Sequence, residues 1–140
     1  MARDRIMGPG PRLELEPTRA PEPATTGSLP LGAILPTESA ARKRIPIVTG
    51  VLDYFPAAIA AIAEVSVAGN DKHNPGQPLH WARGKSNDHA DAVGRHLIER
   101  GNTDLDTKLR HTAELAWRAL ALLQQELEDA GLAPKARGAK

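Results

Sequence analysis

The residues best suited to chemistry lie in an eighteen-residue stretch that runs from Gly69 to Ser86. It holds three glycines, two prolines, two histidines, three Lys or Arg and one of the two tryptophans of the chain. This mixture is too polar for a core and rich in hydrogen-bond donors and rings. Helical patterns flank the stretch, and loops between rigid elements commonly carry binding groups. The sequence therefore indicates a binding loop, with a long connector punctuated by turn residues as the alternative.

A second candidate group follows on the next predicted helix, where charged residues recur at spacings of three and four. Such spacings bring side chains together on one flank, and here the flank carries Asp88, Asp91, Arg95 and Glu99. Three carboxylates repel one another unless a cation lies among them, and either Arg95 or a hard divalent metal can be that cation. The alternative is a solvated face with an internal salt bridge. His89 and His96 fall on the other flank.

Composition limits the protein class. The 140 residues predict one domain, and 18 Lys and Arg against 17 Asp and Glu give a formal charge of +1, so there is no strong case for nucleic acid as a partner. Without Cys, any metal must be held by carboxylates and imidazoles. No apolar run approaches the roughly 18 residues that span a bilayer, and no secretory pattern opens the chain. We expect a cytoplasmic protein with no membrane partner.

The chain divides into three predicted parts. Residues 1–44 are a Pro-rich arm, disordered or bound to a partner, because seven of the twelve prolines lie within residues 1–40. Residues 45–130 form a helical domain, and residues 131–140 a basic flexible tail. We expect an all-α fold, a small bundle of three main helices with the extended N-terminal arm, completed by oligomerisation.

The first main helix is predicted from Pro56 to about Ala68, with Gly69 as its C-terminal stop. It is apolar nearly all round, which is typical of a helix buried all round. Glu64 is its only charge. Burying an unpaired carboxylate costs several kcal/mol, so a cation or metal partner is implied, unless Glu64 reaches water near the helix end.

The second helix is predicted to begin after Ser86 or Asn87 and to stop before Gly101. Its expected core stripe is Ala90, Val93, Gly94 and Leu97. The third is predicted from about Thr103 to Asp129, with a seam of Leu109, Ala113, Ala116, Leu120, Leu123 and Leu127. Leu115 and Leu122 make a second strip, so a second subunit is expected to cover one of the two strips and the protein to be a homo-oligomer.

Two His-x-x-Glu pairs, His96 with Glu99 and His111 with Glu114, have a spacing found in carboxylate–imidazole metal sites of helical bundles. The order is the reverse of the usual Glu-x-x-His. Glu114 can instead pair with Arg110 or Arg118, and we favour that interpretation here.

Several motifs occur in order along the chain: GNDKHNPG at residues 69–76, LHW at 79–81, DHAD at 88–91, RHL at 95–97, HTA at 111–113 and WRAL at 117–120. Over roughly residues 45–128 the chain resembles the phage-encoded dATP/dGTP diphosphohydrolase N-terminal-like family. The resemblance implies a small all-α protein allied to the MazG-like pyrophosphohydrolases, which cleave nucleoside triphosphates to monophosphate and pyrophosphate with magnesium. It would place the protein in the host cytoplasm. The MazG-like signature pairs Glu-x-x-Glu with Glu-x-x-Asp, whereas this chain has only Glu64 on the first helix and Asp88-x-x-Asp91 on the second.

The function expected is a metal-dependent diphosphohydrolase that releases pyrophosphate from the purine deoxynucleotides dATP and dGTP. Glu64, Asp88 and Asp91 would hold Mg2+ or Mn2+, and Glu64, Asp91 or His96 would act on the attacking water. The predicted substrate-binding residues are Lys72, His73, Asn74, Trp81, Arg83, Lys85 and Arg95, with the cations on phosphates, Trp81 stacked on the base and Asn74 at its edge. Trp81 can equally be a core plug. The alternative function is a non-catalytic phage interaction or assembly protein, or a nucleotide-binding module.

Overall fold

The computed structural model of the chain describes residues 33–140, and the regular elements in this range are all helices. Its elements are α1 (Ser39–Lys43), the π-helix η1 (Val48–Leu52), α2 (Pro56–His73), the 3-10 helix η2 (Arg83–Lys85), α3 (His89–Ile98) and α4 (His111–Asp129). In this part of the chain, extended pairing is limited to two isolated bridges, Trp81 with Ala139 and Thr103 with Arg110. The predicted all-α class is confirmed. Most of the predicted arm, residues 1–32, lies outside the described residues.

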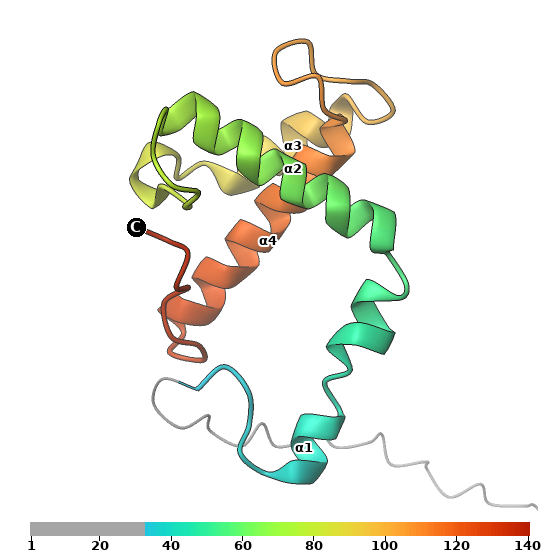
Figure 1. The fold of residues 1–140 in the computed structure, drawn as a ribbon, viewed down its shortest axis with the longest axis vertical. Helices are drawn as coiled ribbons and strands as arrows, with labels where there is room; N and C mark the ends of the chain where they lie inside the picture. The colour runs from blue at the N-terminus through green and yellow to red at the C-terminus, as the bar shows by residue number, and fades with distance from the viewer. Residues whose placement is uncertain (1–32) are drawn as a thin grey trace, which may run out of the picture.

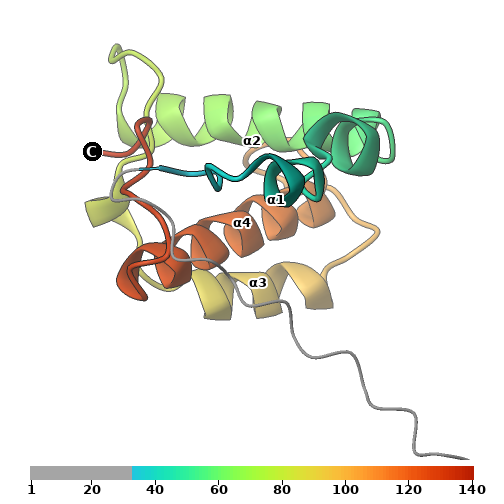
Figure 2. The ribbon, with the colours of Figure 1, turned by 90° about the horizontal axis from the view of Figure 1, so that it is seen from below.

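The long helix α4 is the centre of the fold. It lies between α2 and α3, as Figure 2 shows, and packs most extensively against α3. The short helices α1 and η1 lie to one side of this group (Figure 1). The three main helices therefore form the bundle that positions the loops between them.

Helix α2 begins at Pro56, as predicted, but the prediction that Gly69 ends it is wrong, because the helix continues to His73. A glycine inside a helix costs only about 1 kcal/mol relative to alanine, which tertiary contacts can offset. The buried side chain of Asn70 provides such contacts: its Nδ2 donates to the carbonyl of Gln77, and its Oδ1 accepts the backbone N–H of His80. Pro75 disfavours helical backbone at the residue before it, so the helix stops there.

The start of α3 also differs from the prediction. Asp88, rather than Ser86 or Asn87, is the N-terminal cap residue, and its carboxylate makes no capping hydrogen bond. The reason is that its two oxygens accept hydrogen bonds from Ser86 and Arg95 instead.

Helix α4 begins at His111, so its predicted start near Thr103 is wrong. The carboxylate of Asp104 accepts the backbone N–H groups of Asp106 and Thr107, which closes a side-chain turn. Lys108 then adopts a positive φ of 63°, a conformation that a helix cannot include. The segment before His111 is therefore a loop.

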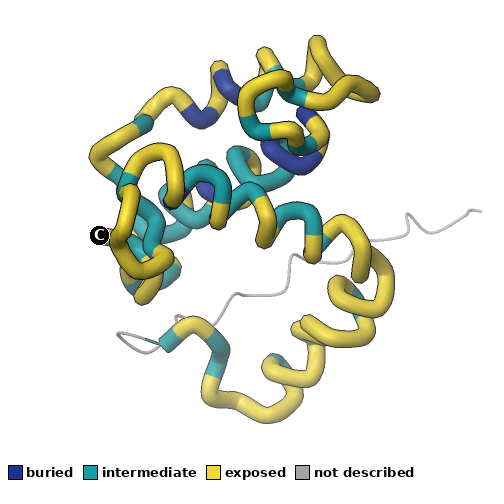
Figure 3. Tube along the Cα trace, turned by 45° about the horizontal axis from the view of Figure 1, so that its top comes forward, coloured by how far each residue is buried: buried dark blue, intermediate teal, exposed yellow. Residues whose placement is uncertain are grey.

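The core of the described residues is small, as Figure 3 shows by its few dark segments. Its buried apolar side chains are Ala92, Ala113 and Ala121, and its buried polar ones are Asn70, His89, His111 and Glu114. The predicted core stripe of α3 is wrong: Ala90, Gly94 and Leu97 are exposed, and the helix buries His89 and Ala92 instead. Two leucines of the predicted α4 seam are not covered by the rest of the chain: Leu120 and Leu123 are 52% and 51% exposed.

A second apolar surface lies outside the core, between α1 and α2. Every large apolar side chain from Ile45 to Phe55 is exposed. No single helix in residues 33–140 is long and apolar enough to cross a membrane; the pair Ser39–Leu52 and Pro56–His73 meets length and composition criteria together but is bent by 87°.

Candidate active site

A cavity of about 690 Å³ lies among α2, α4, the loop between α2 and α3, and the loop that precedes α4. This volume is within the roughly 300–1,000 Å³ typical of small-molecule sites. The C-terminal segment closes part of the wall, because Lys140 donates its backbone N–H to the carbonyl of Trp81 and Ala136 and Gly138 line the cavity.

Three rings form one wall of the cavity. The ring of Trp81 lies 5.8 Å, edge to face, from those of both His89 and Trp117. The indole N–H of Trp117 donates to the hydroxyl of Ser66 on α2 at 2.9 Å, which ties α4 to α2. Trp81 is thus both packed and exposed to the cavity, so its stacking on a base stays a prediction.

His89 is almost fully buried, with 2% of its surface exposed. Its Nδ1 lies 3.3 Å from the guanidinium of Arg118, which can only donate, so Nδ1 accepts and Nε2 carries the hydrogen. That buried Nε2 has no partner among the described residues. Burial, followed by the neighbouring positive charge of Arg118, lowers the pKa of His89 and keeps the ring neutral. The cavity wall therefore contains one buried N–H donor that has no partner among the described residues.

Of the predicted phosphate-binding cations, Lys72 and Lys85 line the cavity, as do the predicted substrate-binding residues His73 and Asn74. The ammonium of Lys72 donates to Asp106 at 2.6 Å, and this hydrogen bond raises the pKa of Lys72. Both partners are largely exposed, and exposed pairs of this kind contribute only about 0–1 kcal/mol. An anionic ligand can therefore displace Asp106 at small cost.

Arg83 lies outside the cavity lining and is engaged elsewhere. Its guanidinium donates to Glu128 at 2.7 Å and lies 4.2 Å above the Trp81 ring. The hydrogen bond from Arg83, followed by those from Gln124 and the backbone of Ala136, lowers the pKa of Glu128 to about 2. These contacts make Arg83 a support for the Trp81 wall.

The charged flank of α3 forms the internal salt bridge that was one of its two predicted interpretations. Arg95 donates to Asp88 at 2.6 Å. Hydrogen bonds from Arg95 and then from Ser86 lower the pKa of Asp88 to about 2. Neither Asp88 nor Arg95 lines the cavity.

Glu64 and Asp91 are both exposed and do not line the cavity. Among residues 33–140 neither makes a side-chain hydrogen bond or an ion pair. For Glu64, the structure therefore agrees with the alternative prediction, in which the carboxylate reaches water. The shared metal site of Glu64, Asp88 and Asp91 stays a prediction.

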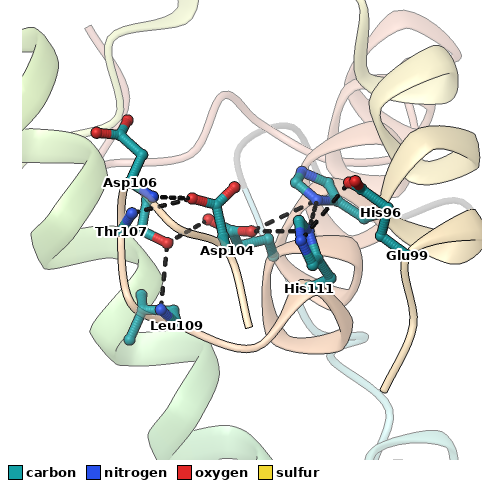
Figure 4. Close-up of polar contacts among 8 residues, drawn as sticks. His96, Glu99, Asp104, Asp106, Thr107, Leu109 and His111 are labelled. Carbon is teal, nitrogen blue, oxygen red and sulfur yellow. Dashed lines mark hydrogen bonds and ion pairs between the residues drawn. The ribbon is translucent and has the colours of Figure 1, made fainter. Parts of the chain in front are cut away.

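A cluster of His96, His111 and Glu114 lies beside the cavity, where α3 meets the first turn of α4 (Figure 4). Glu114 and His111 are each 7% exposed. His96, the third predicted catalytic residue, lines the cavity together with Glu114. We call these three residues the His–Glu cluster.

The spacing of His111 and Glu114 is visible in the sequence, but the predicted partner of the Glu114 carboxylate, Arg110 or Arg118, is wrong. Arg110 donates to the carbonyl of Gly101, and Arg118 donates to Ser86. Glu114 instead accepts from Thr107 and faces the two imidazoles. His96 on α3 faces this carboxylate, whereas the sequence predicts it on a flank beside the apolar stripe of the helix.

Comparison with known proteins gives one result. Residues 37–135 match the family described as dATP/dGTP diphosphohydrolase, N-terminal. Neither a curated protein nor a solved structure matches the chain. The matched range contains α1 to α4 and all but two of the residues that line the cavity.

Proposed function

We propose, from the premise that this chain belongs to the dATP/dGTP diphosphohydrolase N-terminal family, that it hydrolyses purine deoxynucleoside triphosphates to monophosphate and pyrophosphate. The family match carries the proposal, because it spans the helices that surround the cavity. The reaction forms one bond between a water oxygen and the α-phosphorus and breaks the bond from that phosphorus to the bridging oxygen. Pyrophosphate leaves with the electron pair, and a nearby base takes the water proton.

The cavity offers groups for each part of such a substrate. Lys72 and Lys85 line the cavity, and we propose them as the contacts for phosphate oxygens, as point charges. Trp81 and Trp117 supply ring surfaces against which a base can pack. Of the predicted catalytic residues, His96 is the one that lines the cavity, so we assign it the role of holding the attacking water.

A divalent ion, Mg2+ or Mn2+, would neutralise phosphate oxygens during this reaction. We propose Glu64, Asp88 and Asp91 as its ligands on the strength of the sequence. Within one chain α4 lies between α2, which carries Glu64, and α3, which carries Asp91, so a second subunit would have to complete the site. The hydrolase activity can be tested independently of this assignment of the metal ligands.

The test is a screen of dATP, dGTP and other nucleoside triphosphates with Mg2+ or Mn2+, in which both pyrophosphate and monophosphate are measured. We expect metal-dependent, equimolar release of the two products from dATP or dGTP. Glu64→Gln and Asp91→Asn should each lower the rate by about 10²-fold or more, if each removes several kcal/mol of transition-state stabilisation. Glu126→Gln, an exposed acid outside the cavity, is the matched control and should keep the wild-type rate.

Wild-type rates in both acid variants would remove the ligand assignment and leave the hydrolase proposal intact. No turnover of any nucleotide would refute the hydrolase. If the melting temperature still rose with nucleotide, the chain would be a nucleotide-binding module. If it did not, the non-catalytic interaction or assembly protein would replace both.

A further inference from the structure

We propose that the His–Glu cluster binds a first-row transition-metal dication of the Zn2+ class through two imidazoles and one carboxylate. This site shares no metal ligand with the carboxylate site proposed above for Mg2+ or Mn2+. His96, assigned above to hold the attacking water, would here bind the ion through Nδ1. Imidazole nitrogens suit zinc, cobalt and nickel, whereas magnesium prefers oxygen ligands alone. The proposal does not depend on the hydrolase activity.

The first observation is a buried oxygen that lacks a partner. Glu114 Oε2 is buried and accepts no hydrogen bond from the described residues. Leaving a buried charged acceptor unsatisfied costs several kcal/mol, so folding would disfavour this arrangement unless a cation neutralised the carboxylate. The atoms that this oxygen faces are the Nδ1 atoms of His96 and His111, at 3.4 and 3.6 Å.

The second observation is the spacing of the three donor atoms. The two Nδ1 atoms are 3.0 Å apart, and all three donors lie within 4.8 Å of one another. Ligands bound about 2.1 Å from one ion are separated by roughly 3.0–3.4 Å in octahedral or tetrahedral geometry. The three donor separations of 3.0, 3.4 and 3.6 Å lie in or close to that range. Binding would need shifts of only a few tenths of an ångström.

The third observation concerns the atoms that face away from the centre. Thr107 Oγ1 donates to Glu114 Oε1 at 2.9 Å, which leaves Oε2 directed at the imidazoles. The carboxylate of Glu99 lies 3.5 Å from His111 Nε2, so it can orient that ring and leave Nδ1 as the donor. Metal-binding histidines and carboxylates usually have such supporting partners. Figure 4 shows this arrangement, with Asp104 beside the cluster.

The site would keep an open position. His96 and Glu114 line the cavity, so an ion among the three donors would face it. Three protein ligands with one open position are typical of zinc sites that bind water or substrate, whereas structural zinc sites have four.

A metal-free account of the same geometry exists. The two imidazoles can share one proton in a hydrogen bond, and a protonated ring can pair with Glu114. The two accounts differ in one measurable property, since only the metal site binds a dication with defined stoichiometry.

The experiment uses the full chain without an affinity tag, treated with a chelator and then titrated with Zn2+ by calorimetry and with Co2+ by visible absorption. We expect one ion per chain and a cobalt ligand-field spectrum with nitrogen and oxygen ligands. Glu114→Gln and His111→Ala should each weaken binding by at least about 100-fold, and Thr107→Val by about 10- to 100-fold through the carboxylate orientation. His73→Ala, which removes an exposed histidine outside the cluster, should bind Zn2+ as the wild type does.

Circular dichroism of each variant checks that it is folded. If a cluster variant does not fold, the wild-type protein still decides the matter, because Zn2+ should raise its melting temperature and Mg2+ should not. Absence of Zn2+ and Co2+ binding by the wild type would overturn the proposal. Equal loss of affinity in His73→Ala and Glu114→Gln would overturn it too. Neither result would alter pyrophosphate release measured with Mg2+, so failure of this site is distinguishable from failure of the proposed function.

Discussion

Among residues 33–140, His89 is the largest fully buried side chain, and its lowered pKa keeps the ring neutral. Its contacts with Trp81, Trp117 and Arg118 all lie on the cavity wall. Positive charge on the ring would face Arg118 in a site with little water. The contacts of the cavity wall therefore favour the neutral form of His89 over the protonated form.

This burial predicts a pH dependence of stability. The pKa of His89 is lower in the folded state than its ordinary value of 6.5. Between those two values the unfolded chain binds more protons, so the free energy of unfolding should fall as pH drops below about 6.5, by at most about 1.4 kcal/mol per pH unit. Urea titrations between pH 5 and 8 measure this change in the free energy of unfolding. The difference between wild type and His89→Gln isolates this residue.

His73→Gln serves as the control, because that histidine is exposed. An identical pH profile in wild type and His89→Gln would contradict the prediction. Glu128 contributes in a separate range: its pKa is lowered from 4.5 to about 2, so its stabilisation is present above pH 4.5 and is lost as pH falls toward 2.

At the scale of elements, α2 carries a glycine in its interior with space around it. Nothing lies within 4 Å of a Cβ built at Gly69, whose backbone is helical. Gly69→Ala should therefore stabilise the protein by about 0.5–1 kcal/mol, chiefly because alanine restricts the unfolded chain. Chemical denaturation measures the change.

The control for this prediction is Gly101→Ala. Gly101 also has open space, but its φ of 90° strains any residue with a Cβ, so this substitution should destabilise. A loss of stability in Gly69→Ala would show that the residue has a role other than as a helix position.

Some helix ends can be predicted from the sequence and others cannot. The start of α2 and the end of α4 were predictable, because Pro56 and Gly131 act through local backbone geometry that needs no tertiary contact. The start of α4 was not, because the turn at Asp104 competes with helix formation through a side chain that is equally good in a first helical turn.

The orientation of α3 was missed for a different reason. Periodicity identifies faces of a helix, and the apolar face is normally assigned to the core. Here α3 turns His89 and His96 inward because α4 offers them polar partners, Arg118 and Glu114. That pairing depends on two segments far apart in sequence, so a single-helix pattern could not show it. The same limit hid the His–Glu cluster.

For the molecule as a whole, the distribution of apolar surface is the main unexplained property. Three buried alanines are the buried apolar core of the described residues, while large apolar side chains cover the outside of the segment Ile45–Phe55 and one stripe of α4. Monomeric proteins rarely expose large contiguous apolar patches. The stripe of Ala116, Leu120, Leu123 and Leu127 keeps the four-three-four spacing of a helix-pair seam. The sequence predicts that a second subunit covers one apolar strip of α4. We propose that a second copy of the chain covers this stripe and the Ile45–Phe55 surface as well.

The homo-oligomer predicts a specific response to charge. A buried leucine contributes roughly 1.5–3 kcal/mol, so Leu123→Glu should weaken assembly by about 10- to 100-fold or more, and Val48→Glu should do the same if Ile45–Phe55 belongs to the interface. Ala90→Glu adds the same charge on the exposed face of α3 and should leave assembly unchanged. Light scattering and sedimentation across micromolar concentrations measure the mass. A stable wild-type monomer there would rule out the oligomer, and binding of the monomer to neutral lipid vesicles, lost in Val48→Glu, would assign the Ile45–Phe55 surface to a membrane instead.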